Sequence, residues 1–132
     1  MSQENVRVVR QALDAYGRRD VDELRRLNSP ELELDWTASK GWLAGLYCGI
    51  EEALRFYYEY YEVFESSRVE AESYTPVGDS VVVPNVVYQR GRDGIEVTAR
   101  STLVFSMRDG RITHICLYQD TSEALKAMRL EE

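Results

Sequence analysis

Apolar residues near the start of the chain recur every three or four positions, the spacing of an amphipathic helix. They are Val6, Val9, Leu13 and Tyr16. The stripe predicts a first helix that begins near Ser2 and ends at Gly17. Asp20 is followed three residues later by Glu23, which is capping-box spacing and predicts a second, shorter helix up to Leu27.

The pattern then changes to a period of two. Leu32, Leu34 and Trp36 alternate with polar residues, so a short strand with one solvated face is predicted here. Residues 37–49 form an apolar, glycine-containing loop, of the kind that folds over a core or a pocket mouth. Residues 50–64 then predict a long helix with an aromatic face.

Strand patterns and turn residues dominate the remainder of the chain. Strands are predicted at 69–74, 80–90, 96–107 and 112–118, with hairpin turns at 91–94 and 108–111. Pro84 cannot donate to a ladder, so its strand is expected to be at an edge or bulged. Asp120 and Glu123 have the spacing of a cap on a terminal helix, which is preferred to a pocket role for Asp120. Together these elements predict one α+β domain over residues 1–132.

Composition excludes some partners and cofactors. A net charge of -7 disfavours nucleic acid and an anionic membrane surface, because both require clustered Lys and Arg. The start of the chain has no apolar run typical of a signal peptide or a membrane span, so a cytoplasmic protein is expected. Cys48 and Cys116 are expected to be reduced thiols. No metal, nucleotide or flavin motif is present, so no cofactor is expected.

Several short motifs resemble one known family. They are Ala15 to Asp20, Gly49 to Ala53, Gly78 to Val83, Arg108 to Ile112, and Tyr118 with Asp120 to Leu125. With the element order, they make the chain similar to the SnoaL-like polyketide cyclase branch of the nuclear transport factor 2-like, or ketosteroid isomerase-like, superfamily. The resemblance implies a cone-shaped α+β barrel, with N-terminal helices and one long helix packed in a curled antiparallel sheet. It also implies a pocket inside the cone and a homodimer formed through the sheet.

The resemblance extends poorly to catalytic positions. In ketosteroid isomerase-like members the base falls here at Asp35 or Trp36, but the tyrosine donor falls at Ala12 and the carboxylic donor at Thr102 or Leu103. An oxyanion hole needs preorganised donors, so this chemistry is disfavoured. In limonene epoxide hydrolase-like members the Arg and two Asp fall at Asn85, Val87 and Leu117, which leaves no carboxylate to activate water.

Asp35 and His114 are the candidate catalytic residues. A carboxylate at Asp35, pushed into an apolar cone, would have a raised pKa and could act as a base near neutrality. Strand alternation favours the opposite placement, with Asp35 in water. His114 is the single histidine, and alternation with Thr113, Ile115 and Leu117 favours the outer face for it, with Ile112, Cys116 and Tyr118.

The remaining candidates are ligand-binding residues. They are Tyr16, Trp36, Trp42, Tyr57, Tyr61, Asn85, Leu103, Phe105, Ile115, Leu117 and Gln119. Three functions remain open. The first is a cofactor-free acid/base enzyme of isomerase, cyclase or dehydratase type, acting on a small hydrophobic carbonyl compound. The second is a non-catalytic module that binds a small hydrophobic molecule. The third is a homodimeric interaction domain with a vestigial pocket, in which outer-face residues such as Val104 are buried between subunits.

Overall fold

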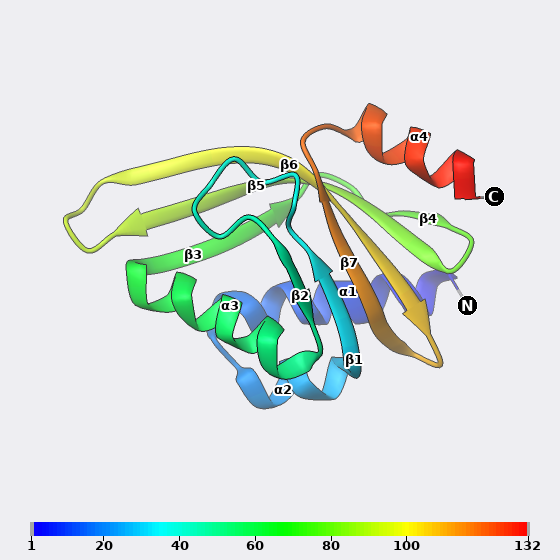
Figure 1. Ribbon diagram of the computed structural model, residues 1–132, viewed down its shortest axis with the longest axis horizontal. Coiled ribbons are helices and arrows are strands. Elements are labelled where there is room, and N and C mark those ends of the chain that lie inside the picture. Colours follow the sequence, from blue (N-terminus) through cyan, green and yellow to red (C-terminus); the bar gives the residue numbers. More distant parts are fainter. Residues whose placement is uncertain (1, 132) are drawn as a thin grey trace.

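A computed structural model describes residues 2–131 and contains four helices and seven strands in one mixed α+β arrangement (Figure 1). The predicted fold class is confirmed. The helices are α1 (Ser2–Arg18), α2 (Val21–Leu27), α3 (Ile50–Val63) and α4 (Thr121–Glu131). The strands are β1 (Asn28–Asp35), β2 (Leu46–Cys48), β3 (Phe64–Ala71), β4 (Thr75–Val77), β5 (Ser80–Gly91), β6 (Glu96–Arg108) and β7 (Arg111–Tyr118).

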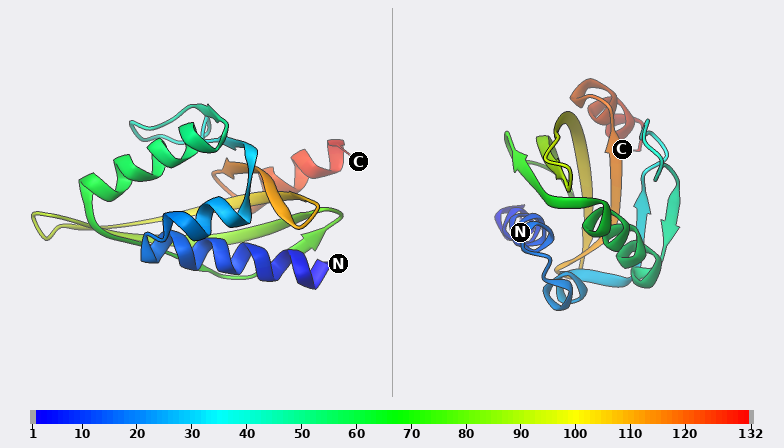
Figure 2. Two further views of the ribbon diagram at one scale, coloured as in Figure 1. Left: turned by 90° about the horizontal axis from the view of Figure 1, so that it is seen from below. Right: turned by 90° about the vertical axis from the view of Figure 1, so that its left-hand side faces the viewer.

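The strands form a single curled sheet that does not close. Its order is β2-β1-β7-β6-β5-β3, with β4 beside β5. Neighbours are antiparallel except β1 and β7, which run parallel. The sheet bends around α3, as the right-hand view of Figure 2 shows. Parallel neighbours need a long connection between them. Here the connection from β1 to β7 contains α3 and the other strands of the sheet.

The main core lies on the concave side of the sheet. Inward residues of β5 and β6 pack there with residues of α1 and α3, since alternate positions of a strand share one face. Examples are Val83, Leu103, Phe105, Val9 and Phe56, all nearly inaccessible to solvent. The convex side carries a smaller cluster in which Ala124 of α4 covers Val82 and Val104. Val104 is therefore buried within its own chain, and it provides no support for an interface between subunits.

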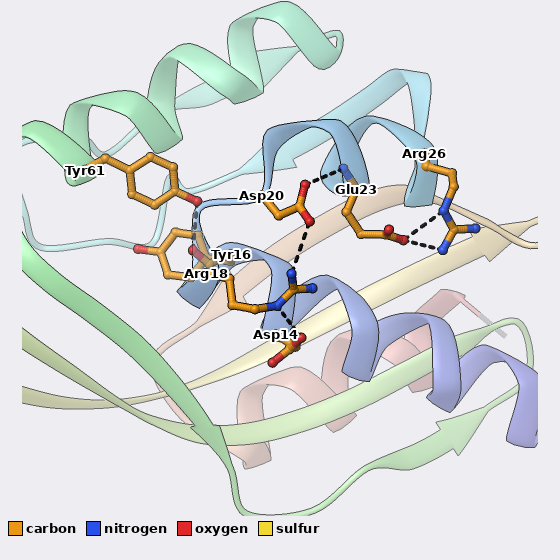
Figure 3. A network of polar contacts seen from close by, with 7 residues as sticks. All are labelled: Asp14, Tyr16, Arg18, Asp20, Glu23, Arg26 and Tyr61. Atoms are coloured by element: carbon orange, nitrogen blue, oxygen red, sulfur yellow. Dashed lines mark hydrogen bonds and ion pairs between the residues drawn. The ribbon is translucent and has the colours of Figure 1, made fainter.

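Local capping sets the helix ends as predicted. Asp20 Oδ1 accepts the Glu23 backbone N–H at 3.1 Å, and Asp120 Oδ1 accepts the Glu123 backbone N–H at 2.8 Å. Around the first cap, Arg18 bridges Asp14 and Asp20 (Figure 3). These caps begin α2 and α4 and confirm the predicted role of Asp120.

The end of α3 is held by a residue from another part of the chain. Arg19 has a positive φ of 60° and its guanidinium donates to the Tyr61, Phe64 and Glu65 carbonyl oxygens at 2.8–3.1 Å. The last carbonyls of a helix have no partner within the helix; Arg19 supplies a donor for that of Tyr61, and Arg92 donates to those of Tyr61 and Glu62. Close by, the Tyr61 hydroxyl donates to the Tyr16 carbonyl oxygen at 2.9 Å (Figure 3). The chain can therefore pass from α3 directly into β3.

Several boundaries differ from the sequence-based predictions. The strand predicted at 69–74 is β3, which begins at Phe64, and the short strands β2 and β4 lie in segments predicted as loop or turn. Pro84 lies within the continuous β5–β6 ladder, so the expected edge or bulge is wrong. Its carbonyl oxygen accepts from Glu72 N at 2.7 Å, between the end of β3 and the start of β4. Proline has no backbone N–H, but this side of Pro84 faces the gap between β3 and β4, so no ladder hydrogen bond is lost.

The start of β7 also departs from simple alternation. A register shift lies between Ser106 and Met107, which pair with His114 and Ile112. The extra residue is Thr113. Ile112 therefore turns to the same inner face as Ile115, and Ile112 is 0% exposed. The assignment of Ile112 to the outer face was wrong because period two fails across a bulge. Within residues 2–131, no helix has the length and apolar character needed to cross a membrane.

Candidate functional site

A cavity of about 390 Å³ lies between the concave side of the sheet, α1 and α3. Eight residues singled out from the sequence line it. They are Tyr16, Trp36, Tyr57, Leu103, Phe105, Ile115, Leu117 and Gln119. Eight further lining residues are apolar, namely Ala12, Leu13, Leu24, Leu34, Phe56, Val69, Val87 and Ala99. The volume lies within the roughly 300–1,000 Å³ of small-molecule sites.

The sheet wall of the cavity follows from strand alternation. Leu103 and Phe105 lie two apart on β6, and Ile115 and Leu117 two apart on β7. Leu103 pairs with Leu117 and Phe105 with Ile115 in the β6–β7 register. Residues directly opposite on neighbouring strands share one face, so these four side chains form a continuous apolar floor.

Aromatic rings form the opposite wall. Phe56 and Tyr60 lie one turn apart on α3, with ring centroids 5.0 Å apart and an edge-on geometry. The Trp36 ring, at the end of β1, lies 5.1 Å from Phe56, and the Tyr57 ring lies 5.4 Å from Tyr16 on α1. Edge-to-face contacts of this kind fix ring positions. The wall therefore offers a set of rigid, largely apolar surfaces.

Tyrosine hydroxyls are the polar groups on this wall. The Tyr16 and Ser67 hydroxyls hydrogen-bond at 2.9 Å, and burial raises the pKa of Tyr16 to about 12 despite that bond. Burial also raises the pKa of Tyr57, whose hydroxyl has no hydrogen-bond partner among residues 2–131. Burial raises the pKa of Tyr60 as well, although a hydrogen bond with the Trp36 side chain tends to lower it. All three phenols are therefore neutral hydrogen-bond donors at physiological pH.

Asn28 is a cavity residue that sequence reasoning missed. It is 1% exposed, and both its backbone N–H and its side-chain Nδ2 donate to the Leu24 carbonyl oxygen. Its Oδ1 is buried and has no partner among the described residues. The segment of Asn28, Ser29 and Pro30 indicated only a helix stop. Nothing in its local pattern predicts that the amide lies in a cavity wall.

A loop forms part of the cavity mouth. Ser39, Lys40 and Gly41 line the cavity, and Gln119 Nε2 holds this loop by donating to the Ala38 carbonyl oxygen at 2.6 Å. Trp42 does not line the cavity. Its ring is 60% exposed and lies 6.2 Å from the Tyr60 ring, because the loop turns it outward. The prediction that this loop folds over a pocket mouth agrees with these contacts.

Asp35 lies outside the cavity, as strand alternation favoured. Burial tends to raise the pKa of Asp35, but hydrogen bonds from the Thr37 hydroxyl and backbone N–H, with His114 nearby, lower it below its usual value. The raised pKa considered for a carboxylate inside the cone is therefore wrong. His114 pairs with Glu33 across the β1–β7 ladder and does not line the cavity either.

Tyr61 and Asn85 are also absent from the cavity lining. Tyr61 lies one turn beyond Tyr57 on α3, and its hydroxyl donates to the Tyr16 carbonyl oxygen. Asn85 is 0% exposed, its Nδ2 donates to the Val83 carbonyl oxygen, and its Oδ1 accepts from the Ser101 hydroxyl. Ser101, which does line the cavity, is thus oriented by Asn85. Its position two residues before Leu103 could have identified it from alternation.

The chemistry available in the cavity is limited by its residue types. Among the described residues that line it, none is an Asp, Glu, His or Cys. Arg100 contributes to the lining, but its guanidinium pairs with Glu72 at 2.8 Å on the other face of the strand. Within residues 2–131 no cluster of acidic, His or Cys side chains could hold a metal ion. The lining can exclude water and donate or accept hydrogen bonds, and of the described residues Lys40 at its mouth is the one general acid/base side chain in it besides the tyrosines.

Solved structures with the same fold are numerous, although no curated protein matches the chain at a significant level. A SnoaL-like polyketide cyclase from Jannaschia sp. CCS1 is 23% identical, with a TM-score of 0.76 over 96% of this chain and 92% of that one. TerC, co-crystallised with polyporic acid, is 20% identical, with a TM-score of 0.77 over 96% and 98% of the two chains.

A third structure has a ketosteroid isomerase-like fold and comes from Catenulispora acidiphila DSM 44928, in complex with trimethylamine. It is 16% identical, with a TM-score of 0.74 over 90% of this chain and 89% of that one. Identities this low show a shared fold alone. The SnoaL-like domain family model matches residues 9–115, which is most of the chain. This protein belongs to the SnoaL-like domain family.

Proposed function

We propose that this protein binds a small, uncharged, ring-containing molecule in its cavity without transforming it. The observation that carries the proposal is the lining itself, in which aromatic and aliphatic walls surround a few hydroxyls and amides, with Lys40 at the mouth and no carboxylate, imidazole or thiol. Small-molecule sites have this composition, with a few polar groups that fix the orientation of an apolar ligand.

The hydroxyl of Tyr57 gives the ligand its most direct polar contact. It lines the cavity, has no partner among residues 2–131, and stays protonated because burial raises its pKa. A phenol of this kind donates a hydrogen bond, so a carbonyl, ether or hydroxyl oxygen on the ligand is a fitting acceptor. The proposed ligand is therefore an apolar ring compound that carries such an oxygen.

Comparison with TerC supports a ring compound. That protein was co-crystallised with polyporic acid, and its fold covers 96% of this chain. The aromatic wall made by Trp36, Phe56 and Tyr60 would stack against a planar ligand here. The apolar floor formed by β6 and β7 would cover its other face.

An acid/base enzyme is the second candidate, and the likeness to a SnoaL-like polyketide cyclase favours it. Tyr16 and Tyr57 could polarise a substrate carbonyl. With no carboxylate or imidazole in the lining, proton removal would fall to Lys40 at the mouth, to the substrate's own groups or to water, because Asp35 and His114 lie outside. If a substrate is found, Asp35→Asn is expected to leave its turnover unchanged; a loss of turnover would place the base at Asp35.

Uptake of N-phenyl-1-naphthylamine, a neutral dye that fluoresces in apolar surroundings, tests the binding proposal. The wild type is expected to show saturable binding. Val87→Trp should abolish it, because Val87 lines the cavity and an indole would fill that space. Val97→Trp is the matched control, since Val97 is on the same hairpin but 47% exposed and outside this cavity. Circular dichroism confirms that both variants fold.

Three results would overturn the proposal. They are no saturable uptake by the wild type, equal uptake by Val87→Trp, or equal loss in Val97→Trp. Competition by uncharged ring compounds then ranks ligands by displacement of the dye. Strong preference for anionic compounds over their neutral analogues would contradict an uncharged ligand.

A further inference from the structure

One polar atom in the cavity wall has no partner to explain its burial. Asn28 Oδ1 is buried and unbonded within residues 2–131, although its residue is only 1% exposed. A buried carbonyl oxygen without a hydrogen bond costs about 1–3 kcal/mol. Native structures rarely leave such an atom unpaired unless water or a ligand supplies the donor.

The orientation of the Asn28 amide is determined by its surroundings. The Leu24 carbonyl oxygen can only accept, so the atom that contacts it at 2.8 Å must be Nδ2. The backbone N–H of Asn28 donates to the same oxygen. A flip of the amide would place two oxygens against each other. The unpaired atom is therefore an acceptor, and it requires a donor from outside the protein.

Tyr57 lines the same cavity as Asn28. Its ring packs against the small cluster that contains Leu24, the residue whose carbonyl holds the Asn28 amide. Both Tyr57 and Asn28 line the cavity, and neither the Tyr57 hydroxyl nor Asn28 Oδ1 has a partner among the described residues. The lining of one cavity thus includes a donor and an acceptor that are both without a partner among the described residues. Such a pair suits a hydroxyl group, which accepts from one neighbour and donates to the other.

We infer that the cavity selects ring compounds that bear a neutral hydroxyl, and that Asn28 recognises this hydroxyl by accepting its hydrogen bond. The inference rests on the proposed binding function and narrows its ligand class. An alcohol or phenol would donate to Asn28 Oδ1 and accept from Tyr57, while its ring body occupies the aromatic wall. A ligand with a methyl group at that point would leave both protein groups unpaired.

A matched pair of ligands tests the inference. 2-Naphthol and 2-methylnaphthalene have nearly the same shape, and differ by a hydroxyl in place of a methyl group. Their dissociation constants are measured by displacement of N-phenyl-1-naphthylamine. The wild type is expected to bind 2-naphthol about three- to tenfold more tightly, the range of one net hydrogen bond. Equal affinities would overturn the inference while leaving the binding proposal intact, whereas absence of dye uptake would defeat the binding proposal itself.

Asn28→Leu removes the acceptor with little change in side-chain volume. It is expected to abolish the preference for 2-naphthol and to leave the affinity for 2-methylnaphthalene unchanged or slightly raised. Ser39→Ala is the matched control, since Ser39 lines the mouth of the same cavity, and it should retain the preference. Persistence of the preference in Asn28→Leu would assign the hydroxyl to another residue and overturn the inference.

A measurement on the wild type covers the case in which Asn28→Leu does not fold. The side-chain amide resonances of Asn28, observed by ¹H–¹⁵N correlation, should shift on addition of 2-naphthol and move much less with 2-methylnaphthalene. Similar shifts with both compounds would show that the ring body alone perturbs the amide, and would overturn the role of Asn28.

Discussion

Alkaline pH should unfold this protein through three buried tyrosines. Burial raises the pKa of Tyr16 to about 12 from an ordinary value of 10, and raises the pKa of Tyr57 and Tyr61 in the same direction. The folded protein therefore retains protons at a pH where the unfolded chain has lost them. Its stability is complete below about pH 10 and falls as the pH rises towards 12, because the unfolded state then binds fewer protons.

The magnitude follows from the size of the shift. Two pKa units at Tyr16 correspond to about 2.7 kcal/mol, at roughly 1.4 kcal/mol per unit. Tyr57 and Tyr61 add to this loss, and a domain of this size is stabilised by about 5–15 kcal/mol in total. The three groups together can therefore remove a large part of the folding free energy between pH 10 and 12.

Ultraviolet absorbance at 295 nm, which reports tyrosinate, should be recorded together with circular dichroism at 222 nm. The late part of the tyrosinate signal is expected to coincide with the loss of helix signal. In urea titrations at pH 9, 10 and 11, Tyr57→Phe should reduce the fall in stability by about 1.4 kcal/mol in total, most of it above pH 10. Tyr58→Phe, on the same helix but 47% exposed, controls for loss of a phenol as such.

The reasoning would be refuted if all nine tyrosines ionised near pH 10 while the circular dichroism stayed unchanged to pH 12. That result would mean that the phenols of the cavity wall reach solvent freely. It would also remove the argument that Tyr57 acts as a protonated donor towards a ligand.

Three further predictions concern stability, and all are measured by urea denaturation. Arg19→Ala should lower the free energy of unfolding by about 1–2 kcal/mol, since the carbonyl oxygens of Phe64 and Glu65 lose this donor and that of Tyr61 keeps only Arg92; no change would mean that water replaces it. Gly110→Ala should cost about 1 kcal/mol because the turn holds Gly110 at φ 77°, and a neutral effect would contradict that strain. Asp35→Asn should cost about 0.5 kcal/mol at pH 7, a small value because its partners are exposed. Since the pKa of Asp35 is lowered, this cost is present above about pH 4 and should vanish as the pH falls through that pKa; a cost that persists at pH 2 would refute it.

Features decided by short-range chemistry were predictable from the sequence. The caps at Asp20 and Asp120 involve a side chain and a backbone N–H three residues away, so their spacing is visible in one dimension. The hairpin between β6 and β7 likewise depends on Gly110, and the alternation of Leu32 and Leu34 correctly favoured an outward Asp35. Eight of the residues proposed from the sequence for a ligand site line the cavity, and their role in binding stays a prediction.

Features that depend on distant partners were not predictable. The residues that follow Phe64 at the start of β3 are polar and carry no strand pattern, and they become a strand because Arg19 holds the end of α3 there and β5 offers a pairing edge. Thr113 forms a bulge that no period in the sequence announces.

The polar chemistry of the cavity shows the same division most clearly. Sequence pattern alone predicted the helices and the longer strands, part of the apolar lining and the family, because these follow from spacing along one segment. It did not reveal that the Tyr61 hydroxyl donates to the Tyr16 carbonyl oxygen while Tyr57 lines the cavity. Nor did it reveal that Asn28 lines the cavity. Only the tertiary structure decided these points, since whether a buried polar group has a partner depends on chain segments that meet after folding.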